Sequence, residues 1–365
     1  MTTKSKGKPG YRDQGKKRAD GVKHNFAINK EQMEYERRKL LQEMSTKLKP
    51  NKKTLNTMAA VAATKEPEYF DEEGKKREPT MRILSLGAGV QSSCLALMAQ
   101  EGLTKHKPDY MIFADTGWEP SFVYEHVEYL KKAITICPII TVERSNIRED
   151  LIRAANPIPG GNEEWKSFAG RVPNPPLFAA RPGGKVGMLY RQCTHDYKVI
   201  PIQKEMRRIL GVKPRHRVKK GTIVEQWIGI STDEAMRMKK ARLPWIESRW
   251  PLIEMKMSRA DCLQWYRDMK KHPMPGKSSC IGCPYHHNDQ WKNMQKNYPK
   301  DFEDACEVDD KIRHGLKNTT AELFLHKKAV PLRSIDFQEK PKQSSLFGET
   351  FDEEFADECE GLCGV

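Results

Sequence analysis

The chain has 365 residues, with 64 Lys and Arg against 49 Asp and Glu, which gives a formal net charge of +15 at pH 7. No apolar run approaches the roughly 20 residues that span a bilayer, and the N-terminus lacks the apolar core of a secretion signal. These features argue against a membrane protein and against a secreted disulfide scaffold, although the chain has nine cysteines. We therefore expect a cytoplasmic protein that is long enough to bury a full core.

The N-terminal part is the most basic region. Residues 1–80 hold 20 Lys and Arg against 12 Asp and Glu. The first 30 residues have little apolar content, which predicts disorder, and residues 30–60 read as a charged helix with a thin apolar stripe. This basic N-terminal extension is either a solvated tail or a surface for a polyanion, such as nucleic acid.

Short strand and helix patterns alternate from Met81 onward. The first expected elements are a strand at 83–86, a helix at 92–101, a strand at 110–114, a helix at 122–134 and a strand at 139–142. Later expected elements are a helix at 198–210, a strand at 224–230, a helix at 258–269 with Ser258 as N-cap, and a helix from 291 to 312 with a break at Pro299. This order predicts an α/β fold, a parallel sheet with helices on both faces.

Three regions follow from the pattern. Residues 1–80 form the extension, 81–335 a single domain, and 336–365 a flexible tail that carries two cysteines. Within the domain, the Pro- and Gly-rich stretch 155–188 is expected to be a functional loop.

Two turns after neighbouring strands favour a nucleotide site. The first, Gly-Ala-Gly-Val-Gln-Ser, runs from Gly87 to Ser92, and the second, Asp-Thr-Gly-Trp-Glu-Pro, runs from Asp115 to Pro120. Small residues allow backbone N–H groups to face a phosphate, and a helix that starts near Ser92 adds its positive end. Strand tips of this kind hold nucleotides in open α/β sheets.

These turns resemble those of the phosphoadenylyl-sulfate (PAPS) reductase group of the adenine nucleotide alpha-hydrolase (PP-loop) superfamily. Members carry S-G-G-x-D-S after the first strand and a D-T-G segment after the second. In this chain Gly87 stands at the first serine and Gln91 at the aspartate. The resemblance covers about residues 81–330. It implies a PP-loop-like fold and an adenine nucleotide ligand, which would be ATP, adenylyl sulfate (APS) or PAPS, with Mg as a further candidate.

Three later segments extend the resemblance. Residues 191–201 are similar to the R-x-C-C-x-x-x-K-x-x-P segment of iron–sulfur members, 229–237 to a G-x-R-x-x-E-S-x-x-R turn, and 278–284 to a later C-x-x-C loop. Together the motifs imply nucleotide-binding roles for Gly87, Gly89, Gln91, Ser92, Ser93, Asp115, Thr116, Gly117, Lys198, Gly229 and Arg237.

Cys193, Cys280 and Cys283 are candidate metal ligands. The C-x-x-C spacing lets two sulfurs face one centre, and Cys193 adds a third thiolate from another loop. Three thiolates fit a [4Fe-4S] cluster with one open iron. The alternatives are a structural zinc site, either Cys₃His with a nearby histidine or Cys₄, and no metal at all.

Cys359 and Cys363 are the candidate catalytic residues. A flexible tail can carry a thiol into a site, and a C-terminal E-C-G-type tail supplies the nucleophile in PAPS reductases. Cys359 follows a glutamate as in that tail, but no glycine comes next. The alternative is a frayed end with exposed thiols.

The resemblance implies a PAPS-reductase-like enzyme that couples an adenine nucleotide to sulfur chemistry. In a sulfonucleotide reductase, a tail thiol attacks adenylyl sulfate and an external dithiol reductant releases sulfite. One alternative is ATP-dependent sulfur transfer to nucleic acid, either thiolation or phosphorothioation, which the basic extension favours. A second is a non-catalytic nucleotide- or nucleic-acid-binding protein with a structural zinc, since Gln91 replaces the loop aspartate.

Overall fold

The computed structural model describes residues 64–71, 73–157, 172–181, 184–317, 319 and 321–337. Most of the predicted extension and nearly all of the predicted tail, including Cys359 and Cys363, lie outside these residues. Within the described part of the chain, no helix has the length and apolar character that a membrane crossing requires.

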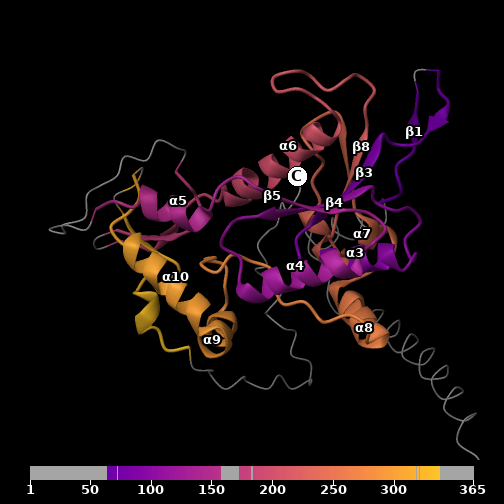
Figure 1. The fold of residues 1–365 in the computed structure, drawn as a ribbon. Helices are drawn as coiled ribbons and strands as arrows, with labels where there is room; N and C mark the ends of the chain where they lie inside the picture. Colours follow the sequence, from indigo (N-terminus) through magenta and orange to yellow (C-terminus); the bar gives the residue numbers. More distant parts are fainter. Residues whose placement is uncertain are drawn as a thin grey trace, which may run out of the picture. The chain divides into compact units, whose positions relative to one another are not determined.

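A five-stranded parallel sheet forms the centre of the described fold (Figure 1). Its strands are β3 (Met81–Leu86), β4 (Tyr110–Asp115), β5 (Ile139–Glu143), β8 (Val224–Ile228) and β9 (Ile246–Arg249). The spatial order is β5-β4-β3-β8-β9, and every neighbouring pair is parallel. The predicted α/β class and parallel sheet are confirmed.

The order of the strands creates a switch point between β3 and β8. From β3 the chain runs outward through β4 to β5, and it then returns to the other side of β3 for β8 and β9. At such a switch point the connections leave the carboxyl ends of adjacent strands in opposite directions, which opens a crevice there.

Helices flank this sheet because alternate strand residues point to opposite faces. Leu84 and Phe113 belong to the apolar cluster that includes α3 (Val90–Gln100), α4 (Ser121–Ala133) and α8 (Arg259–Met269). Ile83 and Ile112, one residue earlier on the same strands, belong to a different cluster, with α6 (Ile200–Ile209).

A third apolar cluster lies beyond the carboxyl end of β4. It includes residues of α5 (Ile147–Ala154), α9 (Asn288–Asn297) and α10 (Pro299–Lys311). A small antiparallel sheet of order β10-β6-β7 accompanies it, built from β6 (Phe178–Ala180), β7 (Gly187–Met188) and β10 (Glu322–Phe324). The described ends of the Pro- and Gly-rich stretch therefore contribute two of these strands.

Several local predictions are confirmed. Ser258 caps α8, because its Oγ accepts a hydrogen bond from Asp261 N at 3.2 Å while the Asp261 carboxylate accepts one from Ser258 N at 2.8 Å. The break at Pro299 is also present, since α9 ends at Asn297 and α10 begins at the proline. A π-helical turn (His195–Val199) precedes α6. The remaining short helices are α7 (Pro251–Glu254), η2 (Thr232–Arg237) and η3 (Leu332–Ser334).

Residues of the segments 64–71 and 73–80 contact the sheet, although the sequence places the start of the domain at Met81. They include a hairpin of β1 (Tyr69–Phe70) and β2 (Lys76–Arg77). Tyr69 Oη donates a hydrogen bond to Glu225 Oε1 at 3.1 Å, and Glu66 Oε1 lies 3.2 Å from Arg249 Nη2. These contacts attach the segment 64–71 to strands β8 and β9 of the folded domain.

Candidate functional site

A cavity lies at the switch point of the sheet. Gly87 and Gly89 line it after β3, Gly229 after β8 and Thr116 after β4, and the loop 277–283 adds a further wall. Most of the residues that the motifs imply for nucleotide binding lie in this lining. They are Gly87, Gly89, Gln91, Ser92, Thr116, Lys198, Gly229 and Arg237.

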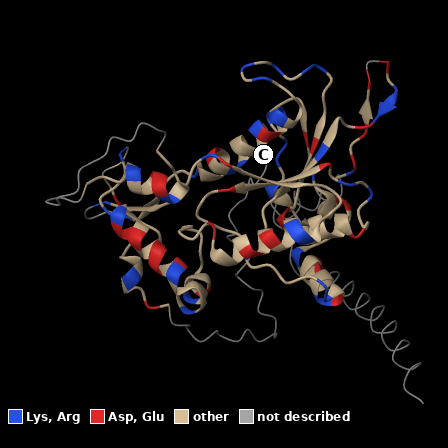
Figure 2. Ribbon diagram, in the orientation of Figure 1, with Lys and Arg blue, Asp and Glu red and all other residues tan. Residues whose placement is uncertain are grey.

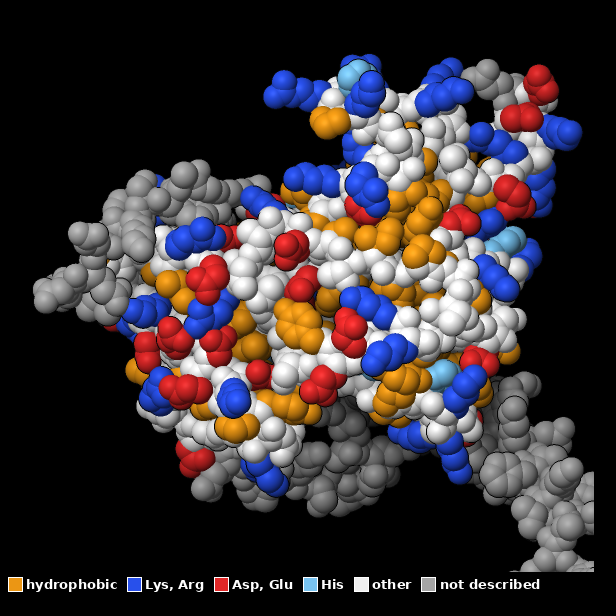
Figure 3. Space-filling view, viewed as in Figure 1, with side chains coloured by type: hydrophobic (Ala, Val, Ile, Leu, Met, Phe, Trp, Pro, Cys, Tyr) orange, Lys and Arg blue, Asp and Glu red, His pale blue; other side chains and the backbone are white. Residues whose placement is uncertain are grey.

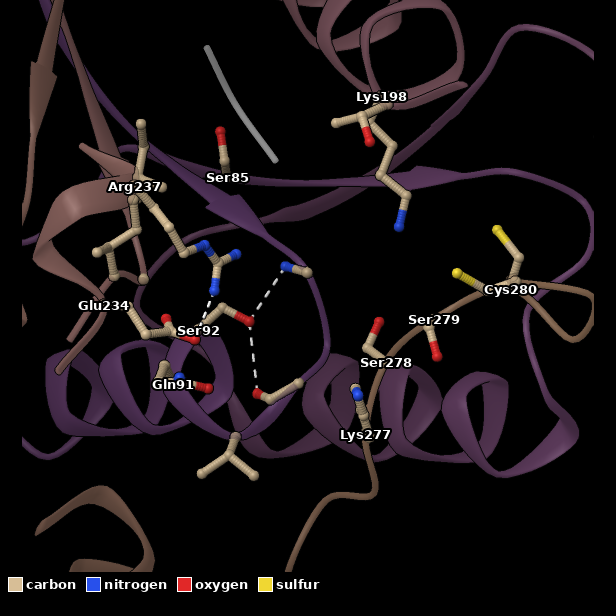
Figure 4. A pocket seen from close by; sticks show the side chains of 18 of the residues that line it. Ser85, Gln91, Ser92, Lys198, Glu234, Arg237, Lys277, Ser278, Ser279 and Cys280 are labelled. Atoms are coloured by element: carbon tan, nitrogen blue, oxygen red, sulfur yellow. Dashed lines mark hydrogen bonds and ion pairs between the residues drawn. The ribbon is translucent and has the colours of Figure 1, made fainter. Parts of the chain in front are cut away.

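The glycine turn presents the start of α3 to the cavity. The helix begins after Gly89 without a hydrogen bond from a capping side chain. Ser92 Oγ accepts a hydrogen bond from Gly87 N at 3.2 Å and donates one to Gly89 O at 3.4 Å, which fixes the turn (Figure 4). Ala88 has a φ of +55°. The N-terminus of a long helix behind a tight turn favours an anion.

Gly229 allows β8 to end against this helix start. A Cβ at Gly229 would lie 2.7 Å from Ser92 Cα and 2.8 Å from Ser92 N, closer than real Cβ contacts. A glycine is therefore required for the close approach of these two backbone segments, both of which line the cavity.

The cavity has an excess of positive charge. Lys198, Arg237, Arg259 and Lys277 line it, while Glu234 is the one acidic residue in the described lining. In Figure 4, Lys198 and Arg237 approach the cavity from opposite sides, and Arg237 Nη1 lies 2.5 Å from Glu234 Oε1. This balance suits a phosphate or sulfate ligand.

Arg259 and Lys277 were not among the predicted site residues. Arg259 begins α8, and its Nη1 donates to Gln91 Oε1 at 3.0 Å. The two residues are 168 positions apart, so no local pattern connects them. For Lys277 the available signal was its position just before the C-x-x-C loop.

The three candidate metal ligands line the same cavity. Cys193 comes from the segment before α6, and Cys280 and Cys283 come from the C-x-x-C loop. Burial raises the pKa of the Cys280 thiol well above its usual value, the Glu119 carboxylate raises it further, and the Lys198 ammonium opposes these effects. Cys280 Sγ lies 3.3 Å from Thr116 Oγ1.

These three thiols line one cavity. Over the described residues, no three His, Cys, Asp or Glu side chains converge closely enough to hold a metal ion. The iron–sulfur and zinc centres stay predictions.

Glu119 is a buried acid beside Cys280 that the sequence motifs did not indicate. Its side chain is fully buried, its Oε1 lies 3.2 Å from Lys198 Nζ, and the same oxygen accepts a hydrogen bond from Thr116 Oγ1 at 3.1 Å. Within the described part of the chain, Glu119 Oε2 has no hydrogen-bond partner. The pair holds Lys198 beside Cys280.

Ser93, Asp115 and Gly117 are not part of the lining. Ser93 Oγ bonds to His126 Nε2 at 3.1 Å. The Asp115 carboxylate accepts hydrogen bonds from Gly117 N at 2.7 Å and Tyr124 Oη at 2.9 Å. Gly117 has a φ of +72°, which the turn requires. These three residues shape the turn after β4 and the core behind the cavity.

Comparison with protein-family models and with curated proteins finds no match for this chain. The site must therefore be interpreted from its own geometry.

Proposed function

We propose that the cavity binds an adenine nucleotide through its phosphate or sulfate groups, and that the chain is a PAPS-reductase-like enzyme that couples the nucleotide to sulfur chemistry. The observation that supports this proposal is the combination found in one cavity: an uncapped helix start, four cationic side chains and three cysteines. An anion-binding end and a sulfur-bearing wall are what a sulfonucleotide needs.

In this proposal the charged groups orient the ligand. Its phosphate oxygens accept hydrogen bonds from the turn at Gly87–Ser92, between Arg237 and Arg259. Its sulfate or α-phosphate faces Lys198 and the cysteine wall. Arg259 lines the cavity, and its Nη1 donates a hydrogen bond to Gln91 Oε1, which positions the guanidinium beside the turn.

This arrangement suits attack by a thiolate on the sulfur of adenylyl sulfate. An S–S bond forms, the bond between sulfur and the bridging phosphate oxygen breaks, and AMP leaves with the electron pair. The cations stabilise the charge on the leaving phosphate. An external dithiol then reduces the thiosulfonate, which gives sulfite and a disulfide of the reductant. The predicted nucleophiles Cys359 and Cys363 belong to this proposal.

ATP-dependent sulfur transfer to nucleic acid is the second candidate. The observation that favours it is the group of exposed Lys and Arg side chains outside the cavity, at 212–223 and 238–245. Such a surface suits a polyanionic acceptor better than a small dithiol. In this version ATP adenylates the acceptor, and pyrophosphate leaves before sulfur displaces AMP.

Anaerobic purification followed by parallel assays tests the proposal. Iron, zinc and sulfide are measured first, and ATP and adenylyl sulfate are then offered separately with dithiothreitol. Sulfite with AMP supports the reductase, and pyrophosphate from ATP supports adenylation. If calorimetry detects binding of neither nucleotide at millimolar concentration, the proposal is wrong. Tight binding without either product indicates a non-catalytic nucleotide-binding protein instead.

A further inference from the structure

Two exposed stretches outside the cavity contain many cations and no acid. One is the loop 212–223 between α6 and β8, and the other is the segment 238–245 between η2 and β9. Their eight Lys and Arg side chains are all exposed, and we call them the basic track. They are Lys213, Arg215, Arg217, Lys219, Lys220, Lys239, Lys240 and Arg242.

The two stretches cover one face of the sheet. Val218 from the loop and Ala241 and Leu243 from the segment pack against the same buried cluster as α6. In Figure 2 the ribbon of the loop between α6 and β8 extends at the top with blue positions and no red ones, and Figure 3 shows basic side chains gathered on the same protrusion. The cations therefore form a shared surface.

The loop is held by other basic residues at its base. Arg207 Nη2 donates to His216 O at 2.5 Å, and Arg77 Nη2 donates to Gly221 O at 2.5 Å. Thr80 N also donates to Ile223 O at 2.8 Å. A loop fixed in this way presents its charges with less loss of conformational entropy when a partner binds.

The track runs along the strand direction, from one end of the strands to the other. Segment 238–245 begins beside Arg237, which lines the cavity at the carboxyl ends of the strands. It leads to the start of β9, and the loop leads to the start of β8, so both reach the amino ends of the strands. A five-residue strand spans about 17 Å. Duplex nucleic acid carries one phosphate charge per about 1.7 Å, so about ten phosphates match this length.

We propose that the basic track binds the phosphodiester backbone of a nucleic acid. The track suits phosphates because arginine and lysine side chains bind phosphate oxygens through charge-assisted hydrogen bonds. None of the large apolar side chains that the described residues expose lies in the track. Membrane-surface binding usually adds such apolar anchors to the charge, and base stacking needs exposed aromatic rings. Backbone contacts without base reading predict binding that depends little on sequence.

This inference goes beyond the proposed function, because the track can bind its partner whether or not the cavity turns over a nucleotide. The probes are a 20-base-pair DNA duplex, a 20-nucleotide RNA and phosphatidylserine vesicles. The full-length chain is compared with a track variant, Lys213→Gln, Arg215→Gln, Arg217→Gln and Lys219→Gln. The control variant removes equal charge from other exposed lysines: Lys132→Gln, Lys300→Gln, Lys327→Gln and Lys328→Gln.

Fluorescence anisotropy across a salt series gives the affinity and its salt dependence. We expect the track variant to bind DNA or RNA at least tenfold more weakly. We also expect the slope of log K against log salt to be smaller by about two to four in the track variant, and both quantities to stay near the parent values in the control. Calorimetry with ATP checks that the cavity is intact in both variants, which separates this result from the proposed function. The inference is overturned if the two variants lose equal affinity, if neither changes, or if the track variant loses only vesicle binding.

Discussion

Lys198 Nζ lies 3.2 Å from Glu119 Oε1, and the Glu119 side chain is fully buried while that of Lys198 is 14% exposed. The lysine belongs to the π-helical turn before α6, and the glutamate follows the tip of β4. This ion pair therefore joins two segments that lie 79 positions apart in the sequence, directly behind the cysteine wall of the cavity.

Breaking this pair from one side should be costly. Lys198→Met leaves a buried carboxylate without its counter-charge, and we expect the free energy of unfolding to fall by about 3–5 kcal/mol. The double variant Glu119→Gln with Lys198→Met removes both charges and should recover most of that loss. Urea denaturation of both proteins measures the difference. Equal stability of the single and double variants would show that the pair carries no such energy.

The glycine at the end of β8 should be necessary for the shape of the cavity. Gly229→Ala places a methyl group against the backbone of Ser92, so either the turn moves or the strand end does. We expect a loss of stability of about 1–3 kcal/mol, together with weaker ATP binding by calorimetry. Gly187→Ala is the matched control, because a Cβ there meets no atom within 4 Å. The interpretation fails if the two alanine variants behave alike.

The arginines of the cavity should determine anion affinity. Arg237→Gln and Arg259→Gln each remove a charged donor, and hydrogen bonds to charged groups contribute about 1.5–3 kcal/mol. We therefore expect each change to weaken ATP binding by about tenfold to a hundredfold in calorimetry. Arg267→Gln, an exposed position on the same helix as Arg259, serves as the control. An equal loss in the control would point to a general effect of charge.

His126 should make stability depend on pH. Burial lowers its pKa to about 4 from an ordinary value of 6.5. As the pH falls below 6.5, the unfolded chain takes up a proton at this residue before the folded chain does. The stability present above pH 6.5 is therefore lost as the pH falls toward 4, with an upper bound of about 1.4 kcal/mol per pH unit for one proton.

The variant His126→Gln isolates this contribution, because its amide stays neutral. Urea unfolding at pH 7.5, 6.0 and 5.0 should show a steeper loss for the parent than for the variant. His286 and His326 also have a pKa lowered to about 4 by burial, but they are present in both proteins and cancel in the comparison. Parallel pH profiles would contradict the assignment.

Local patterns predicted the elements that depend on local interactions. Val123, Val127 and Leu130 occur at helical spacing, and all three are buried in α4. The cap at Ser258 was also correct, because a capping box involves residues only three positions apart. The turns at Gly87–Ser92 and Asp115–Pro120 were also predicted correctly at strand ends, because each continues directly from its strand in the sequence.

Long-range pairing could not be predicted in the same way. Nothing near Val224 in the sequence shows that β8 pairs with β3, yet this neighbour makes Gly229 part of the cavity. The strand β10 pairs with β6 although Phe324 and Phe178 are far apart in the chain. The ion pair of Glu119 with Lys198 could not be predicted either, because it forms only when the fold brings the two residues together.

Trp118 packs beneath the loop that supplies two of the cysteines. Its side chain is 4% exposed, its Nε1 donates to Asp304 Oδ2 at 2.6 Å, and its carbonyl accepts a hydrogen bond from Ile281 N at 2.8 Å. A Cβ at Gly282 would lie 2.0 Å from the indole ring. One aromatic residue thus connects the tip of β4, the C-x-x-C loop and α10.

A consequence for dissecting the protein follows from this tryptophan. A fragment that ended after α8 would keep every strand of the parallel sheet, yet it would leave the indole without a cover and the cavity without the 277–283 wall. The parallel sheet and its cavity therefore depend on the later part of the described chain, and truncation from the C-terminal side should expose apolar surface around Trp118.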